Sequence, residues 1–245
     1  MTTVVILGAT SGIGQATARV WAARGCDIRL VGRDAERTAR AAADLLVRGA
    51  GSVASHLLDL SSADAVAEAV DWAFGAGPVD IALVTFGTMP PAEEADASYE
   101  VAASLLEVNG SMCLLAAHGI TLRLLAQGSG ALAVVGSVAG DRGRQSNYLY
   151  GAAKAMVATG VAGLQHRAAS SPVAITLVKP GPTATPMTDH LRGGRLSLAK
   201  VETVAGDIVR GVDRGTPVVY TPRKWQLIMA VIRLLPRRVF ERTKL

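Results

Sequence analysis

Tyr150 and Lys154 stand four residues apart in the stretch "SNYLYGAAK", which has the composition of a helix. Residues four apart leave a helix on the same face, so a phenol and an ammonium would lie about one turn from each other. A free phenol has a pKa near 10, and a neighbouring ammonium stabilises its phenolate. Tyr148 is six residues from the lysine and is expected to face elsewhere. The spacing therefore predicts that Tyr150 exchanges a proton with a reacting oxygen.

Two further polar residues precede this pair. Ser137 follows the apolar run "GALAVVG" and lies 13 residues before Tyr150, and Asn109 lies in "LEVNGSM" on an expected helix. Hydride transfer to a ketone builds negative charge on oxygen, which a hydroxyl can stabilise while the phenol supplies the proton. Taken alone, the serine could satisfy a turn at a strand end, and Asn109 could have either a structural or a catalytic role.

A glycine-rich turn follows the first apolar run of the chain. Gly8, Gly12 and Gly14 form "GATSGIG" directly after "TVVIL" and before a segment with helical spacing. Such glycines let the backbone approach a pyrophosphate, which the amide groups and the positive end of the helix then hold. The alternative is a turn that serves only tight packing. The strand and helix on either side favour a dinucleotide site.

The spacing G-x-x-x-G-x-G, together with Tyr-x-x-x-Lys and the upstream serine, resembles the short-chain dehydrogenase/reductase family from Thr3 to about Met187. The resemblance implies that Tyr150 is the acid in ketone reduction, that Lys154 also binds the nicotinamide ribose and that Ser137 bonds the carbonyl. It implies that Asn109 holds a water. The cofactor contacts that it implies are Gly8, Thr10, Ser11, Gly12, Ile13, Gly14, Asp59, Leu60, Phe86, Gly87, Tyr150, Lys154, Pro180, Gly181, Thr183 and Thr185.

Two departures from the family pattern stand near the cofactor contacts. "LVTFGT" replaces the frequent Asn-Asn-Ala-Gly, and Thr183 replaces an aliphatic residue. The cofactor itself is predicted from the end of the second strand, where an acid that would bind the ribose of NAD is replaced by Gly32 and followed by Arg33. A guanidinium there can hold a 2′-phosphate, so NADP(H) is favoured over NAD(H). Alternatively, Arg33 is a solvated surface residue and Asp34 caps the next helix.

Short apolar runs alternate with longer helical segments along the 245 residues. The runs are nearly continuous, which is typical of parallel strands buried on both faces. We expect an α/β fold: a single doubly wound Rossmann domain over residues 1–222, with about seven parallel strands flanked by helices, and a basic amphipathic helix in an extension over residues 223–245. Cys26 and Cys113 lack the spacing of a disulfide framework or a zinc site, and we expect no metal.

The positive charge of the chain is concentrated in this extension. Residues 223–245 hold seven Lys or Arg and one acid, whereas the whole chain has a net charge of +5. The main domain therefore lacks the basic stripe of a nucleic-acid binder. The apolar run from Trp225 to Leu235 is too short to span a bilayer, but it suits a helix with Trp and Leu in an anionic membrane interface. A helix that packs on the domain or on a partner subunit is the equal alternative.

The expected substrate is a ketone. Asp141, Arg142 and Arg144 follow the catalytic serine, where the arginines could meet a phosphate or form a solvated turn. With the tail, this loop is similar to that of reductases acting on decaprenylphosphoryl 2-keto-erythro-pentofuranose, a lipid-linked keto-sugar. The alternatives are a reductase of another lipid or of a small soluble ketone, and a non-catalytic NADP-sensing protein. The resemblance also implies a homodimer or homotetramer, and we expect a cytoplasmic protein that lies peripherally on the inner face of the membrane.

Overall fold

Seven parallel strands form one sheet within residues 1–191 and 197–243, which the computed structural model describes. Their order is β3-β2-β1-β4-β5-β6-β7, so the chain changes direction across the sheet between β1 and β4. Ligands of such sheets bind at this switch point, beyond the carboxyl ends of the strands. The strands are β1 (Thr3–Leu7), β2 (Asp27–Gly32), β3 (Val53–Leu57), β4 (Ile81–Val84), β5 (Ala131–Val135), β6 (Ala174–Pro180) and β7 (Val218–Thr221).

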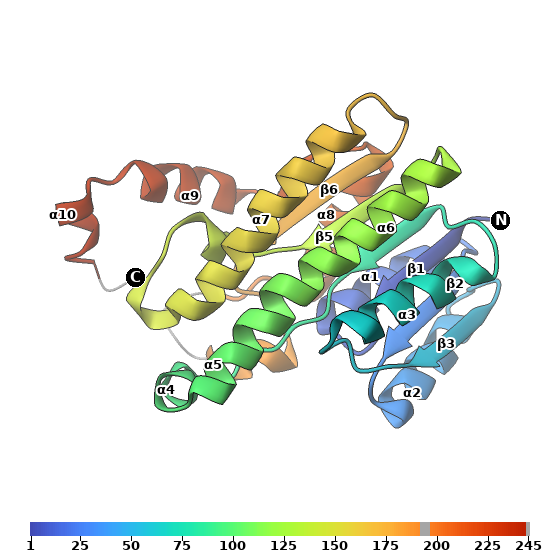
Figure 1. The fold of residues 1–245 in the computed structure, drawn as a ribbon, viewed down its shortest axis with the longest axis horizontal. Coiled ribbons are helices and arrows are strands. Elements are labelled where there is room, and N and C mark those ends of the chain that lie inside the picture. The colour runs from blue at the N-terminus through green and yellow to red at the C-terminus, as the bar shows by residue number, and fades with distance from the viewer. Residues whose placement is uncertain (192–196, 244–245) are drawn as a thin grey trace.

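Helices cover both faces of the sheet (Figure 1). The cores place α1, α2 and α8 on one face and α3, α6 and α7 on the other. The helices are α1 (Gly12–Ala22), α2 (Ala35–Val47), α3 (Ala63–Gly75), α4 (Ala92–Ala97), α5 (Tyr99–Leu106), α6 (Cys113–Gln127), α7 (Tyr148–Ala168), α8 (Val201–Asp213), α9 (Lys224–Leu234) and α10 (Arg237–Phe240). The predicted doubly wound sheet of about seven strands is confirmed.

Successive side chains of the central strands point alternately into the two cores. In β1, Val5 and Leu7 belong to one core while Val4 and Ile6 belong to the other, as the period of two along a strand requires. The expectation of strands buried on both faces therefore holds in the middle of the sheet. It is wrong for β3, which is mostly exposed because it lies at the edge and pairs with β2 alone.

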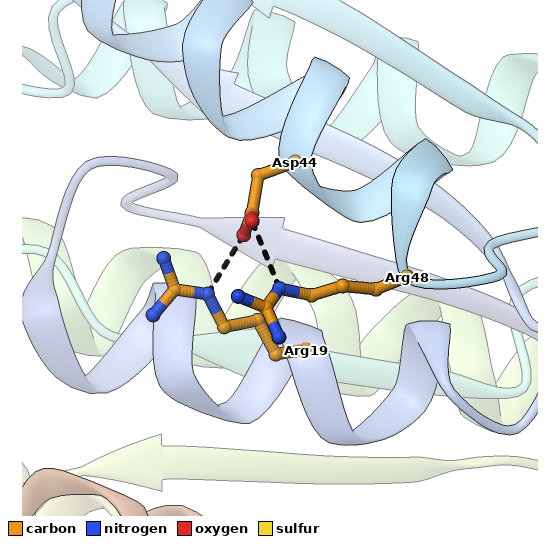
Figure 2. Close-up of polar contacts among 3 residues, drawn as sticks. All are labelled: Arg19, Asp44 and Arg48. Atoms are coloured by element: carbon orange, nitrogen blue, oxygen red, sulfur yellow. Dashed lines mark hydrogen bonds and ion pairs between the residues drawn. The ribbon is translucent and has the colours of Figure 1, made fainter.

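An acid between two arginines joins α1 to α2 (Figure 2). Arg19 and Arg48 each donate from Nε to Asp44, at 2.7 Å and 2.8 Å. Burial works against the ionised carboxylate, but the two hydrogen bonds outweigh it and hold the pKa of Asp44 below its ordinary value. This contact fixes the two helices that follow β1 and β2.

The helices α5 and α6 join through a π-helix, Glu107–Met112, into one stretch from Tyr99 to Gln127. By length and composition this stretch could cross a membrane, but half of its most apolar window is buried in the protein. It is packed as a core helix of the domain: α6 supplies Ile120 and Leu124 to the core that it shares with α3 and α7.

Candidate active site

The glycine turn after β1 is closely packed. Gly8 has a φ of +103°, and a Cβ there would lie 2.7 Å from the backbone nitrogen of Phe86. Gly12 lies beside Thr185, whose Cγ2 would be 2.9 Å from an added Cβ. A side chain at either position would therefore require the neighbouring segments to move apart.

Ser11 begins α1 and ties the turn to β4. Its hydroxyl accepts a hydrogen bond from the Gly14 amide at 3.4 Å and lies 3.1 Å from the hydroxyl of Thr85. The carbonyl of Ile13 accepts the hydroxyl of Thr17. The first-turn amides of α1 lack partners within the helix, and with the bare glycine turn they suit a diphosphate. The residues present therefore fit a dinucleotide.

The end of β2 leaves no space for an acidic side chain at Gly32. A Cβ there would lie 2.7 Å from the buried hydroxyl of Thr38, for which the described residues provide no hydrogen-bond partner. Arg33 is exposed and lies 3.6 Å from Asp59, another predicted cofactor contact. Asp34 caps α2, as the alternative interpretation expected, by accepting from the Arg37 amide at 2.9 Å.

Arg37 was not singled out from the sequence. Its guanidinium donates to the carbonyl of Thr10 in the glycine turn at 3.0 Å. Its side chain therefore extends from the first turn of α2 to the turn that would hold the pyrophosphate. The signal that could have identified it is its position four residues after Arg33, beside the Asp34 cap.

Lys154 is the buried cation of the site, with 3% of its surface exposed. Its Nζ donates to the carbonyl of Val135 at 3.3 Å and lies 5.7 Å from the centre of the Tyr150 ring. Tyr150 itself is half-buried on the first turns of α7. The expected arrangement of phenol and ammonium on one helix face is present.

The turn that follows Ser137 packs against α7 next to Lys154. Ser137 caps the 3₁₀ helix Val138–Asp141, its hydroxyl accepting from the Ala139 amide at 3.1 Å. A Cβ at Gly140 would lie 2.7 Å from the backbone of Lys154, so the turn and α7 are in direct backbone contact. This contact brings Ser137 to the end of α7 that carries Tyr150.

Asn109 is fully buried in the π-helix. Its side-chain amide donates to the carbonyls of Thr88 at 2.8 Å and Leu105 at 2.9 Å, and its oxygen accepts from the Thr88 amide at 3.1 Å. It thus holds the segment after β4 by backbone contacts. Gly87 is packed on it, since a Cβ there would lie 2.5 Å from Asn109 Oδ1 and 3.9 Å from Lys154 Nζ.

The remaining predicted cofactor contacts lie at or just after the carboxyl ends of the strands. The carbonyl of Phe86 accepts from the buried Cys113 thiol at 3.4 Å, and Leu60 lies in the core beside β1. Pro180 ends β6, and Thr183 is buried with its hydroxyl on the carbonyl of Gly181 at 2.9 Å. Thr185 is also buried, and its hydroxyl lies 3.3 Å from that of Thr188.

Gly181 makes a contact that the sequence did not indicate. A Cβ there would overlap the indole of Trp225, the first buried residue of α9. Trp225, Met229 and Ile232 form a small core with Val138, which directly follows Ser137. The tail therefore packs on its own domain through Trp225, as one of the two alternatives for this helix expected, and this Trp does not face a lipid surface.

Arg142 is one of the two arginines that could meet an anion, but its guanidinium already has partners within the chain. Its guanidinium donates to the carbonyls of Ile232 and of Leu235, the latter at 2.8 Å, and lies 3.9 Å from the ring centre of Phe240. It holds the C-terminal end of α9, because the last carbonyls of a helix need donors. Arg142 therefore fits neither alternative, because its guanidinium is not free for a substrate phosphate and does not stand in a solvated turn.

Asp141 has partners within the domain as well. Lys179 Nζ lies 2.5 Å from one carboxylate oxygen, and the hydroxyl of Tyr220 donates to the other at 2.8 Å. Burial, together with the hydrogen bond to Asp141, raises the pKa of Tyr220 to about 12. This group therefore joins the loop after Ser137 to β6 and β7.

Arg144 contrasts with Arg142. Its Nε is buried and has no hydrogen-bond partner in the described part of the chain, and the same holds for Oδ1 of Asn147 three residues later. Burial lowers the pKa of the Arg144 guanidinium below its usual value. Both atoms belong to the segment between Ser137 and Tyr150, so a donor and an acceptor are left without partners there.

Tyr148 lies apart from the lysine. Its side chain is half exposed, and its hydroxyl donates to Asp96 of α4 at 3.1 Å, which raises the pKa of this phenol. It therefore bridges the start of α7 to the segment after β4.

As for a metal, no group of three His, Cys, Asp or Glu that could hold one is present within residues 1–191 and 197–243.

Comparison with known proteins gives the family. A family model described as short chain dehydrogenase matches residues 2–195. An uncharacterized oxidoreductase of Mycobacterium tuberculosis is 33% identical over 244 residues, which cover 98% of this chain and 96% of that protein. Another from Streptomyces coelicolor is 32% identical over 242 residues, with 98% and 94% covered.

Solved structures agree with this result. A short-chain dehydrogenase from Sphingobium yanoikuyae in complex with NADPH has a TM-score of 0.83 and 25% identity, with 97% of both chains covered. An actinorhodin polyketide ketoreductase with NADPH has a TM-score of 0.80 at 20% identity, with 90% of this chain and 95% of that chain covered, and supports the fold. The chain therefore belongs to the short-chain dehydrogenase family and is a nucleotide-dependent oxidoreductase.

Proposed function

We propose that the protein reduces a ketone to a secondary alcohol with NADP(H), and that Tyr150 supplies the proton. The observation that carries this proposal is the buried Lys154, 5.7 Å from the Tyr150 ring, beside the turn that begins at Ser137. The described residues give this buried ammonium no carboxylate partner, and such a group favours negative charge on a neighbouring phenol oxygen. When bound, the nicotinamide supplies the hydride, and the chain's own residues orient the carbonyl and deliver the proton.

The preference for NADP(H) rests on the end of β2. An acid at Gly32 would collide with Thr38, whereas Arg33 is exposed and forms only a 3.6 Å contact with Asp59. Arg37 extends to the glycine turn from the same side. Two guanidiniums at this point suit the 2′-phosphate that distinguishes NADP from NAD. The relative from Sphingobium yanoikuyae, solved with NADPH, is consistent with this choice.

The proposed ketone carries an anionic group, and a lipid-linked keto-sugar with a polyprenyl phosphate fits this description. Arg144 supports it, because a buried guanidinium nitrogen without a partner is costly unless a ligand supplies one. Asn147 would give an acceptor to a sugar hydroxyl.

We further propose a homodimer or homotetramer at the inner face of the cytoplasmic membrane. Leu115 and Leu122 of α6 and Met156 of α7 are exposed apolar residues that a second subunit would cover.

The test is NADPH oxidation by the purified full chain against a panel of ketones. The panel contains a polyprenyl-phosphate keto-sugar, a short water-soluble phosphorylated keto-sugar, a keto-lipid without phosphate and a small neutral ketone. We expect turnover with at least one member and the largest kcat/KM for the phosphorylated ketones. NADPH binding without oxidation of any member would instead support the non-catalytic sensor, and a preference for the neutral ketones would contradict the anionic substrate.

A further inference from the structure

The helix α9 carries two apolar stripes. Trp225, Met229 and Ile232 are buried on the domain, whereas Leu227, Val231 and Leu234 are exposed at 72%, 55% and 83% of their surface. Each stripe has the same spacing, and the second is the first shifted by two residues. Because a helix turns by about 100° per residue, the two stripes point in opposite directions. The exposed stripe is therefore an apolar surface on the side of α9 that faces away from the domain.

The buried stripe fixes the orientation of the exposed one. Trp225 packs on Gly181 of the loop after β6, and Arg142 holds the other end of α9 through the carbonyls of Ile232 and Leu235. Both contacts come from segments that border the candidate active site. The exposed stripe is thus part of a surface whose position relative to Ser137 and Tyr150 is set by the fold. In Figure 1, α9 and α10 extend from one end of the molecule, away from the N-terminus.

Exposed basic side chains stand before and after the exposed stripe in the sequence. Arg223, Lys224, Arg238 and Arg242 are exposed, and none forms an ion pair with an acid within the described ranges of the chain. Arg237 is paired with Glu241 at 2.6 Å, the acid of this segment. An apolar stripe between unpaired cations matches the interfacial region of a bilayer with anionic headgroups, where apolar side chains enter the acyl boundary and arginines meet phosphates.

We propose that the exposed stripe of α9, with its basic rim, docks on an anionic membrane surface. A second copy of this chain suits the surface less well, because two such stripes face to face would bring their cations together, and Glu241 is already paired with Arg237. Docking would place α9, which packs on Val138 next to Ser137, between the bilayer and the loops of the candidate active site. Given the proposed reductase function, the substrate would be a lipid ketone taken from that surface.

Flotation of the full chain with vesicles tests the docking. Vesicles of phosphatidylcholine with phosphatidylglycerol are compared with vesicles of phosphatidylcholine alone, at low and high salt. We expect the protein to float with the anionic vesicles only, and less at high salt. Combining Leu227→Ser, Val231→Ser and Leu234→Ser should lower the bound fraction about tenfold or more, while NADPH binding and thermal unfolding stay as in the wild type because the buried stripe is intact.

Leu46→Ser with Val47→Ser on α2 is the matched control, since it also removes exposed apolar side chains and should not change flotation. Failure of the full chain to float, or equal flotation of the α9 variant, overturns the proposal. A wild-type dimer that the α9 variant converts to a monomer, without flotation of either, assigns the stripe to a second copy instead. Flotation needs no substrate, so its failure leaves the reductase function standing, and an inactive protein that floats leaves the docking standing.

Discussion

The nucleotide side and the substrate side of this domain are built in different ways. At the glycine turn, one contact is local, since the Ser11 hydroxyl accepts from the Gly14 amide three residues later, and the others come from segments that follow strands of the sheet: Gly8 lies against Phe86 and Gly12 against Thr185. On the proposed substrate side, Arg142 donates to the carbonyl of Ile232, 90 residues away, and Val138 packs on Trp225. The glycine turn is therefore packed by segments of the sheet domain itself, whereas the surroundings of Ser137 also depend on the packing of the tail. Changes on the two sides should separate cofactor binding from turnover.

Tyr150→Phe should have the largest effect. It removes the proposed proton donor without changing the glycine turn, so we expect kcat to fall by roughly 10² to 10⁴ while NADPH affinity changes little. Steady-state turnover and NADPH fluorescence titration measure the two quantities. Tyr148→Phe is the matched control and should keep most activity, because its hydroxyl bonds Asp96 rather than the site. Equal losses in the two variants would contradict the assignment.

Trp225→Ala should have the second-largest effect. The indole is buried between Gly181 and Val138, and truncating a buried aromatic residue costs about 3 kcal/mol or more. We expect a lower unfolding free energy in urea and a loss of turnover, because the loops on both sides of the substrate lose their support. Trp225→Phe should recover much of both. Normal turnover in a stable Trp225→Ala protein would show that the tail does not shape the site.

Arg33→Gln tests the nucleotide side alone. A charged hydrogen bond to a phosphate contributes about 1.5–3 kcal/mol, so the Kd for NADPH should rise tenfold or more and that for NADH should stay the same. Fluorescence titration with both nucleotides gives the ratio. Arg40→Gln, on the helix α2 that follows Arg33 and paired with Glu36, serves as the control. A parallel loss of NADH binding would point to a folding defect instead.

Arg144→Gln tests the substrate side alone. We expect KM for a phosphorylated ketone to rise about tenfold, with a smaller change in kcat and none in NADPH affinity, because the guanidinium is proposed to bind a part of the substrate that does not react. The KM for a neutral ketone should not change. An equal change for both ketones would indicate a structural role for Arg144.

Asp44→Asn should have the smallest effect. The pKa of Asp44 is lowered in the folded protein, so its stabilisation is present above its unfolded value near pH 4 and is lost as the pH falls through the lower folded value. We expect the variant to be less stable by about 1 kcal/mol at neutral pH and the difference to shrink toward pH 3. Urea unfolding at both pH values measures it, and a difference independent of pH would show that the charge contributes nothing.

The sheet, its helices and the family could be predicted from the sequence, because apolar period and glycine spacing are local signals. The Tyr-x-x-x-Lys spacing identified Tyr150 and Lys154 as candidates, and the fold places them on one side of α7 near the Ser137 turn. Their roles stay predictions. The partners of Arg142 could not be predicted, since nothing in the loop after Ser137 indicates where α9 ends. Nor could the opposite directions of Trp225 and Leu227 be assigned, because the tail is apolar at both positions.

The most direct test of the central claim follows the hydride itself. The wild-type chain is given its best ketone with NADPH that carries deuterium at the transferable position of the nicotinamide, and the product is examined by mass spectrometry. The account predicts one alcohol formed for each NADPH consumed, with deuterium on the carbinol carbon. NADPH loss without deuterated alcohol, or alcohol without deuterium, would contradict a ketone reductase built on Tyr150 and Lys154.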